Sequence, residues 1–513
     1  MKEYPVKEPV AIFDIGSNAV RLVVYDGLTR APVKIHNERN ICGLGADLAV
    51  TGRLNPDGVA KALGSLKRFS GLVRAMKIQH VYAVATAAVR DAEDGADFIA
   101  AVRQQTGLDI SVIDGKEEAR LAALGVMANG MGQDGIIGDY GGGSLELVAV
   151  EKGRVKHTVS LPLGSHRLHV LPTRAARIKE IDAQLDTVDF LEDYKGRAFT
   201  ALGGAWRSMA KAHMHLKKYP LFLLDHYAIG GAKAAEFADL MSRQSAASLE
   251  KAVGLTKKRV RDVGVAALTM ERLFERLRPR ELVFSAAGLR EGLLFDQLPP
   301  ALQKQDPLIA GCETFALRAG RFENLRGFHA LARFVEPLFA REDASVLRLV
   351  AAGCILSDTC GFEHEDYQAA QAFRRIFVFP FTGLDHPGRA FLALSQYARY
   401  KGYVRRGRRE KGEDVTFPAQ KLLDERMTGL AVTAGLAQRL GYVLTGGALE
   451  LLKHAALNVT PERLTLKLDP EGKTLNADVI VRAVADLAKA AGREGVIDLQ
   501  KFPPQPAKPA PRR

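Results

Sequence analysis

Residues Ile136 to Val148 read IIGDYGGGSLELV. An apolar run ends at Asp139, a glycine-rich turn with Ser144 follows, and a second apolar run contains Glu146. This order predicts a strand, a tight turn and a returning strand. Glycines let a phosphate approach the main chain closely, and successive N–H groups in such a turn can bind an anion. Asp139 would repel that phosphate unless a cation lay between them, and Mg²⁺ prefers such oxygen ligands.

The same order of residues occurs at Val10 to Tyr25, VAIFDIGSNAVRLVVY. Here the first strand ends at Asp14, a Gly-Ser-Asn turn follows, and the second strand carries Arg21. One such unit alone is as easily an ordinary hairpin in which Asp and Gly serve the turn. Two copies about 125 residues apart favour a duplicated domain with two facing phosphate-binding turns.

The composition narrows the class of protein. The chain has 513 residues, 47% of them hydrophobic and 26% charged, which predicts three or four globular domains. Four scattered cysteines without metal-ligand spacing favour a reducing compartment. We see no signal peptide and no apolar run long enough to cross a membrane, so we expect a cytoplasmic protein. The net charge of +13 favours a polyanionic partner, which charge alone leaves open between nucleic acid, polyphosphate and an anionic membrane surface.

Alternating strand and helix patterns predict α/β layering up to about residue 300, with domains at 9–128 and 129–300. After a polar, proline-bearing stretch the pattern becomes helical over 307–440, and helix signals continue from Gly446 to Leu457. A small α+β unit is expected at 441–500, and 501–513 is expected to be a disordered tail. The basic segment from Arg399 to Lys411 is either a solvated loop or a strip that binds a polyanion.

The residues allow phosphoryl transfer, which needs neutralised phosphate charge and an oriented nucleophile. Glu118 lies in the first turn of a predicted helix, where the helix dipole alone could explain it; the alternative is a general base that takes a proton from water. Asp14, Asp139 and Glu146 are the candidate Mg²⁺ ligands, although Glu146 could equally be a solvent-facing strand residue. The candidate phosphate-binding residues are Asp14, Gly16, Ser17, Asn18, Arg21, Arg90, Gly141, Gly142, Gly143, Ser144, Gly204 and Gly288.

Several motifs resemble one known family. They are DIGSNAVR (14–21), ATAAVRDA (85–92), DGKEEARLAALGV (114–126), GDYGGGSLEL (138–147), LPLGSHRL (161–168), LGGAWR (202–207), HYAIGG (226–231) and SAAGLREGLL (285–294). In this order they are similar to the exopolyphosphatase / guanosine pentaphosphate phosphatase family of the actin-like ATPase superfamily. The resemblance implies two actin-like (ribonuclease H-like) α/β domains that close on a cleft. It also implies Mg²⁺-dependent removal of terminal phosphate from polyphosphate, and hydrolysis of pppGpp to ppGpp in many members.

The family's catalytic glutamate falls on Glu118. Tyr140 departs from the usual small aliphatic residue, and we expect its side chain to point away from the cleft. Longer members carry a helical domain similar to HD phosphohydrolases. Here Ser357-Asp358 replaces the metal-binding His-Asp pair and Asp385-His386 has the reversed order, so we interpret this domain as a degenerate HD-like module without its own metal. It would lengthen a basic channel or form a dimer surface.

Together these observations predict a cytoplasmic, homodimeric exopolyphosphatase in which Glu118 activates water and Mg²⁺ assists, with K⁺ as a candidate activator. Four alternatives remain open at this point. The main substrate could be pppGpp, or the protein could be a sensor that binds polyphosphate or nucleotide without turnover. It could also bind nucleic acid through its basic excess, or transfer phosphate from polyphosphate to a nucleoside diphosphate.

Overall fold

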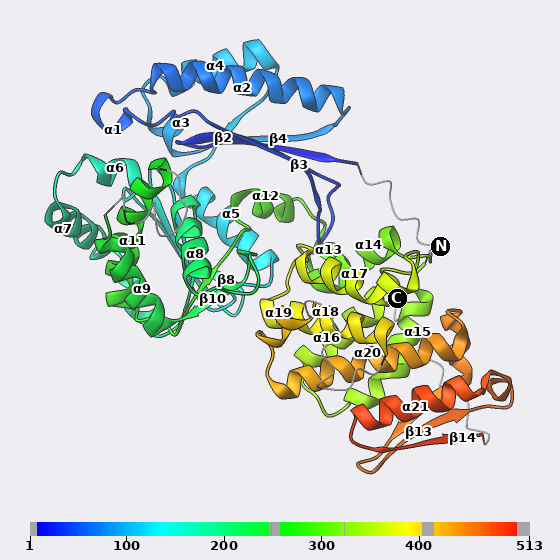
Figure 1. Ribbon diagram of the computed structural model, residues 1–513. Coiled ribbons are helices and arrows are strands. Elements are labelled where there is room, and N and C mark those ends of the chain that lie inside the picture. The colour runs from blue at the N-terminus through cyan, green and yellow to red at the C-terminus, as the bar shows by residue number, and fades with distance from the viewer. Residues whose placement is uncertain (1–7, 246–247, 249–256, 323, 403–414, 500–513) are drawn as a thin grey trace. The chain divides into compact units, whose positions relative to one another are not determined.

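The structure is a computed structural model that describes residues 8–245, 248, 257–322, 324–402 and 415–499. The chain forms two compact units, which we call unit 1 (Met1–Pro307) and unit 2 (Leu308–Arg513) (Figure 1). Most of the predicted basic segment at 399–411 and the predicted tail at 501–513 lie outside the described residues. No helix within the described ranges is both long and apolar enough to cross a membrane.

Unit 1 contains two mixed sheets with the same internal topology. The first has the order β3-β2-β1-β4-β5, and the second has the order β10-β11-β9-β6-β7-β8. In each, three antiparallel strands (β3-β2-β1 or β8-β7-β6) continue into three parallel strands (β1-β4-β5 or β6-β9-β11). The duplication predicted from the two Asp-containing hairpins is therefore confirmed, with β10 as an extra antiparallel edge strand.

The strands of the first sheet are β1 (Val10–Ile15), β2 (Ala19–Tyr25), β3 (Lys34–Ile41), β4 (His80–Ala85) and β5 (Ser111–Val112). Those of the second are β6 (Gly135–Tyr140), β7 (Leu145–Glu151), β8 (Arg154–Leu161), β9 (Ala198–Leu202), β10 (Tyr227–Gly230) and β11 (Glu281–Phe284). The helices up to the second sheet are α1 (Leu48–Thr51), α2 (Pro56–Ala75), α3 (Ala87–Asp91), α4 (Gly95–Thr106) and α5 (Gly115–Ala128). They are followed by α6 (Ser165–Val170), α7 (Arg174–Leu185), η1 (Asp189–Tyr194), α8 (Gly204–Leu216), α9 (Gly231–Arg243), α11 (Lys257–Leu277), α12 (Leu289–Asp296) and α13 (Pro300–Gln303).

Local sequence explains several helix ends. The Asn55 side chain accepts a hydrogen bond from the Gly58 N–H at 2.7 Å, and Pro56 begins α2, as the capping preferences predict. Helix α4 ends at Gly107, whose φ of 75° is in the left-handed region that favours glycine. The Asp114 side chain caps α5 by accepting from the Glu117 N–H at 2.8 Å, which fixes the start of the helix that carries Glu118.

Helices α5 and α12 lie between the two sheets of unit 1 (Figure 1). Strand alternation sends Phe13 of β1 toward α2 and α4, whereas Ile12 points toward α5 and α12. The two helices meet backbone to backbone at a pair of glycines. A Cβ on Gly125 would lie 2.1 Å from the Gly288 carbonyl oxygen, and one on Gly292 would lie 1.8 Å from that of Leu121. No larger residue fits at this crossing.

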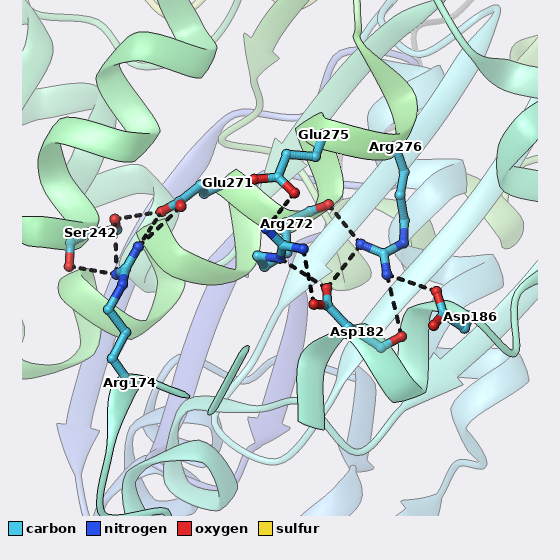
Figure 2. Close-up of polar contacts among 8 residues, drawn as sticks. All are labelled: Arg174, Asp182, Asp186, Ser242, Glu271, Arg272, Glu275 and Arg276. Atoms are coloured by element: carbon cyan, nitrogen blue, oxygen red, sulfur yellow. Dashed lines mark hydrogen bonds and ion pairs between the residues drawn. The ribbon is translucent and has the colours of Figure 1, made fainter. Parts of the chain in front are cut away.

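The outer face of the second sheet packs on α7, α8, α9 and α11. The Tyr140 ring stacks on Trp206 in this core, with ring centroids 5.2 Å apart, so its side chain points away from the cleft, as predicted. Ion pairs also connect the helices. The Asp182 carboxylate accepts hydrogen bonds from Arg272 at 2.9 Å and from Arg276 at 3.0 Å, which ties α7 to α11. Figure 2 shows these contacts, which extend to Glu275 and Asp186. It also shows a second group, in which Arg174 and Ser242 contact Glu271.

Unit 2 is helical with a small sheet near its C-terminal end. Its helices are α14 (Pro307–Ala319), α15 (Arg326–Val335), η2 (Glu336–Phe339), α16 (Ala344–Ile355), η3 (Leu356–Asp358), α17 (Glu365–Val378), α18 (His386–Lys401), α19 (Phe417–Gln420), α20 (Glu425–Thr445), η4 (Leu449–His454), η5 (Gly472–Leu475) and α21 (Asp478–Ala490). The sheet has the order β12-β13-β14, formed by β12 (Ala455–Val459), β13 (Arg463–Leu468) and β14 (Glu494–Asp498).

The predicted helix from Gly446 to Leu457 is wrong. Gly446 and Gly447 have φ angles of 60° and 92°, so they end α20, and the following residues form η4 and then β12. At the degenerate HD-like positions, Asp358 is buried and accepts from Arg321 Nη2 at 2.7 Å, while the hydroxyls of Ser357 and Tyr442 lie 3.1 Å apart. The Asp358 carboxylate is thus paired with the Arg321 guanidinium. The relation of this domain to HD proteins stays a prediction.

Candidate active site

A cavity of about 460 Å³ in unit 1 collects nearly all the residues that the sequence singled out. Both sheets contribute to it, through the β1–β2 turn and the β6–β7 turn. Arg90 is the one candidate that is not part of its lining. The candidate residues that line the cavity are Asp14, Gly16, Ser17, Asn18, Arg21, Glu118, Asp139, Gly141, Gly142, Gly143, Ser144, Glu146, Gly204 and Gly288.

The two turns have matching geometry. The Gly16 N–H donates to the Ala19 carbonyl at 3.1 Å, and the Gly141 N–H donates to the Ser144 carbonyl at 2.9 Å. They also lie close together, since a Cβ built on Gly143 would be 3.4 Å from Ser17 Oγ. The two turns therefore face one cavity, from which both can offer main-chain N–H groups to the same anion.

Each turn is preceded by an acidic residue that pairs across its hairpin. Asp14 lies opposite Arg21 in the β1–β2 register, and Asp139 lies opposite Glu146 in the β6–β7 register. The first hairpin thus presents one carboxylate and one guanidinium, whereas the second presents two carboxylates. This difference makes the second hairpin the more acidic side of the cavity.

Three carboxylates of the cavity resist ionisation. Burial and the carboxylates of Glu146 and Asp139 raise the pKa of Glu118 well above its ordinary value, while Arg90 acts in the opposite direction. Burial and Asp139 raise the pKa of Glu146 to about 7, although Ser160 Oγ donates to its Oε1 at 3.0 Å. Burial also raises the pKa of Asp139. Clustered, desolvated carboxylates of this kind are frequent at functional sites.

Two arginines that the sequence analysis did not single out neutralise part of this charge. Arg290 of α12 donates from Nη1 to Asp14 Oδ2 at 2.5 Å. Arg207 of α8 donates from Nε to the Ser285 carbonyl at 3.0 Å, and its charge opposes the rise in the pKa of Asp139. Each arginine lies in the first turn or so of a helix that begins at a small-residue turn singled out by the analysis. Arg290 is the second residue of α12 and Arg207 the fourth of α8, and this place at the helix start was the available signal.

Other missed residues widen the basic wall. Arg39 of β3 and Lys211 of α8 line the cavity. Burial, together with the charges of Arg290 and Arg39, lowers the pKa of Arg21 to about 10, which reflects how many cations converge here. The local sequence around Arg39 and Lys211 does not indicate a site residue, because strand pairing brings Arg39 to the cavity and helix packing brings Lys211 there.

Arg90 contacts the candidate base. Its Nη1 lies 3.4 Å from Glu118 Oε2 and 3.3 Å from the Ile113 carbonyl, and its Nε donates to Asp91 at 2.9 Å. Asp91 also accepts from Arg167, whose Nε donates to the Gly143 carbonyl at 3.1 Å. A chain of polar contacts therefore connects Glu118 to the second glycine turn. The predicted phosphate contact of Arg90 stays a prediction.

The acidic side of the cavity fits a divalent cation. Asp14 is paired with Arg290, which leaves Asp139, Glu146 and Glu118 as the carboxylates in excess. Within the described residues, no group of three or more His, Cys, Asp or Glu side chains is close enough to form an all-protein metal site. Mg²⁺ is commonly held by one or two carboxylates, with water and substrate phosphates completing its shell, so this donor set suits it.

Comparison with known proteins identifies the family to which this architecture belongs. The model of the Ppx/GppA phosphatase family matches residues 23–301, and that of the exopolyphosphatase C-terminal region matches 329–497. The chain belongs to the Ppx/GppA phosphatase family. Membership of this family makes the protein a phosphatase, and its two repeated sheets are the actin-like pair that the resemblance implied.

Among relatives of this Ppx/GppA protein, "Exopolyphosphatase 1" of Mycobacterium tuberculosis is 28% identical over 305 residues, covering 56% of this chain and 88% of that protein. "Retrograde regulation protein 2" of Saccharomyces cerevisiae is 24% identical over 450 residues, covering 77% and 73%. The crystal structure of an exopolyphosphatase from Cytophaga hutchinsonii matches with a TM-score of 0.52 at 22% identity, covering 56% of this chain and 96% of that one. This likeness supports the fold of unit 1.

Proposed function

We propose that the protein is an exopolyphosphatase that removes the terminal phosphate of inorganic polyphosphate. The observation that carries this proposal is that Glu118 lines the same cavity as both glycine turns. An enzyme for phosphoryl transfer has to bind charged oxygens and orient a nucleophile, and these three features supply both requirements. The relatives named exopolyphosphatase and the net charge of +13 support a polyanionic substrate.

In this proposal the two turns bind the terminal phosphate from opposite sides, and Arg21 and Arg207 bind its charged oxygens. Glu118 takes a proton from a water molecule, and the water oxygen attacks the terminal phosphorus. The bond from phosphorus to the bridging oxygen breaks, which releases phosphate and a chain shorter by one unit. Asp139 and Glu146, with Asp14, would hold Mg²⁺, which when bound neutralises phosphate charge. Burial raises the pKa of Glu118, so its ionised carboxylate is a stronger base than an exposed one.

The test compares Glu118→Gln with Glu117→Gln. Both glutamates lie in the first turn of α5, but Glu117 forms an ion pair with Arg120 at 2.7 Å on the outside of the helix. We expect Glu118→Gln to release phosphate from long-chain polyphosphate about 10²–10⁴ times more slowly, and Glu117→Gln to stay within about threefold of the wild type. A Glu118 variant within about tenfold of the wild type would remove this residue from the role of base.

The same assay with pppGpp as substrate distinguishes the main alternative. If phosphate release from pppGpp exceeds that from polyphosphate by an order of magnitude in kcat/KM, the proposed substrate is wrong and the proposed chemistry stands. If neither substrate is hydrolysed while both bind, the protein is a sensor and the proposal fails.

A further inference from the structure

Unit 2 contains a second cavity, of about 510 Å³, formed by α15 and by η4 with the start of β12. Helix α15 is labelled in Figure 1. The volume exceeds that of a single phosphate and is within the range of ligand-binding pockets. The buried side chains of Phe334 and Leu452 form part of its lining, so the cavity has an apolar floor.

Basic side chains from two elements surround this floor. Arg326, His329 and Arg333 are spaced three and four residues apart on α15, which places them on one face of the helix. Lys453 of η4 adds a further cation. Among the described residues, the side chains of Arg326, Arg333 and Lys453 form no ion pair, whereas His329 Nε2 lies 3.8 Å from Glu313 Oε1. Glu450 is the one carboxylate in the lining, so cations outnumber carboxylates three to one.

Such an arrangement favours a multiply charged anion. Like charges held around a hollow repel one another, and a multiply charged anion relieves that repulsion. Arginine binds phosphate through two parallel N–H groups, and Arg326 also begins α15, where the helix dipole favours negative charge. Cations on two elements that face one cavity can contact more than one phosphate group at a time.

We propose that this cavity is a second phosphate-binding site, which recognises a ligand with two or more linked phosphates. The residues that bind are Arg326, Arg333 and Lys453, with His329 at the edge. The proposal concerns unit 2 alone and does not rest on the hydrolysis proposed for unit 1.

The experiment measures hydrogen exchange of the full chain in the Glu118→Gln background, with inorganic tripolyphosphate as the probe. We expect slower exchange in the segments 326–335 and 449–455 as the probe is titrated. The double variant Arg326→Gln, Arg333→Gln should weaken this protection at least tenfold in probe concentration, since a hydrogen bond to a charged group is worth a factor of about 10 or more. Both side chains are exposed, so the variant should fold.

A matched control removes the same charge elsewhere in unit 2. Arg341→Gln with Lys473→Gln changes two exposed cations outside the cavity and should leave the protection unchanged. The same exchange measurement is repeated with two other probes, sulfate at equal ionic strength and a nucleoside triphosphate. The proposal is overturned if these segments show no protection, if the cavity variant and the control respond alike, if sulfate protects as well as tripolyphosphate, or if the nucleoside triphosphate alone protects.

Discussion

Glu146 shows how one buried side chain couples charge to stability. It is 3% exposed, and burial with the neighbouring Asp139 raises its pKa to about 7 from a usual value near 4.5. The folded protein therefore binds more protons than the unfolded chain between these two pH values. Stability must fall as pH rises through this window, because the slope follows the difference in bound protons between the unfolded and folded states.

Glu146→Gln removes the charge and keeps an oxygen that can accept from Ser160. In the presence of a chelator, we expect the variant to exceed the wild type in free energy of unfolding by on the order of 3 kcal/mol at pH 8, since a pKa unit corresponds to about 1.4 kcal/mol. At pH 5 the gain should be much smaller. Urea denaturation at both pH values measures this, with Glu151→Gln on the same strand as the control. An equal gain at both pH values would contradict the explanation.

Residue patterns located the acidic half of the site better than the basic half. Asp139 and Glu146 follow from the hairpin, since a strand end beside a glycine turn has few possible neighbours. Arg39 and Lys211 could not be predicted, because their place depends on how β3 pairs with β2 and on how α8 packs against the second sheet. Arg90 shows the same limit, since its contact with Glu118 depends on the loop before α5.

At the level of elements, the ion pairs of Figure 2 hold α11 against α7. We expect Asp182→Asn to lower the free energy of unfolding by about 1–3 kcal/mol, because two half-buried arginines would lose a charged partner. The arginines also lower the pKa of Asp182, against the opposing effect of its burial. The ionised group therefore contributes stability above its usual pKa near 3.8 and loses it as pH falls below that value.

The control for this prediction is Asp239→Asn. Asp239 pairs with Arg243 four residues later at 2.6 Å, and both side chains are about half exposed, so its loss should cost no more than about 0.5 kcal/mol. Chemical denaturation of both variants at low and high salt measures the difference. If the two variants lose equal stability, the network contributes no more than a surface ion pair.

Elements with strong caps or alternation were predictable, and those fixed by tertiary pairing were not. Helix α2 starts at Asn-Pro and α4 ends at a glycine, as capping preferences favour. The error after Gly446 has a physical cause: its leucines suit a helix, yet two glycines with positive φ turn the chain into η4 and β12. Strand β14 was missed because five residues gain their structure from pairing with β13.

At the scale of the molecule, the match to the Ppx/GppA phosphatase family lies within unit 1. Exopolyphosphatase 1 aligns over 88% of its own length with 56% of this chain, and the two sheets with their cores lie within residues 10–294. We therefore expect residues 1–307 alone to unfold in one cooperative transition and to release phosphate from short polyphosphate within about tenfold of the full chain. Calorimetry and a phosphate assay measure these two properties.

Long polyphosphate should be hydrolysed differently by residues 1–307 and by the full-length protein. If unit 2 lengthens a basic channel, as its predicted role requires, residues 1–307 should release long polyphosphate after fewer successive cleavages. Gel analysis of the intermediate chain lengths shows this as a ladder of partly shortened products. A truncated protein that degrades long chains with no such ladder would contradict a role for unit 2 in processive hydrolysis, whatever its activity on short chains.

The glycine crossing of α5 and α12 has a mechanical consequence. With no side chain between the two backbones at Gly125 and Gly292, a rotamer change cannot absorb a displacement of one helix relative to the other. A displacement of α12 at Arg290 should therefore be passed to α5, which carries Glu118. If Glu118 is the base proposed above, it and the guanidinium that pairs with Asp14 shift together when substrate binds. The position of the proposed base then depends on two glycines that are not part of the cavity lining.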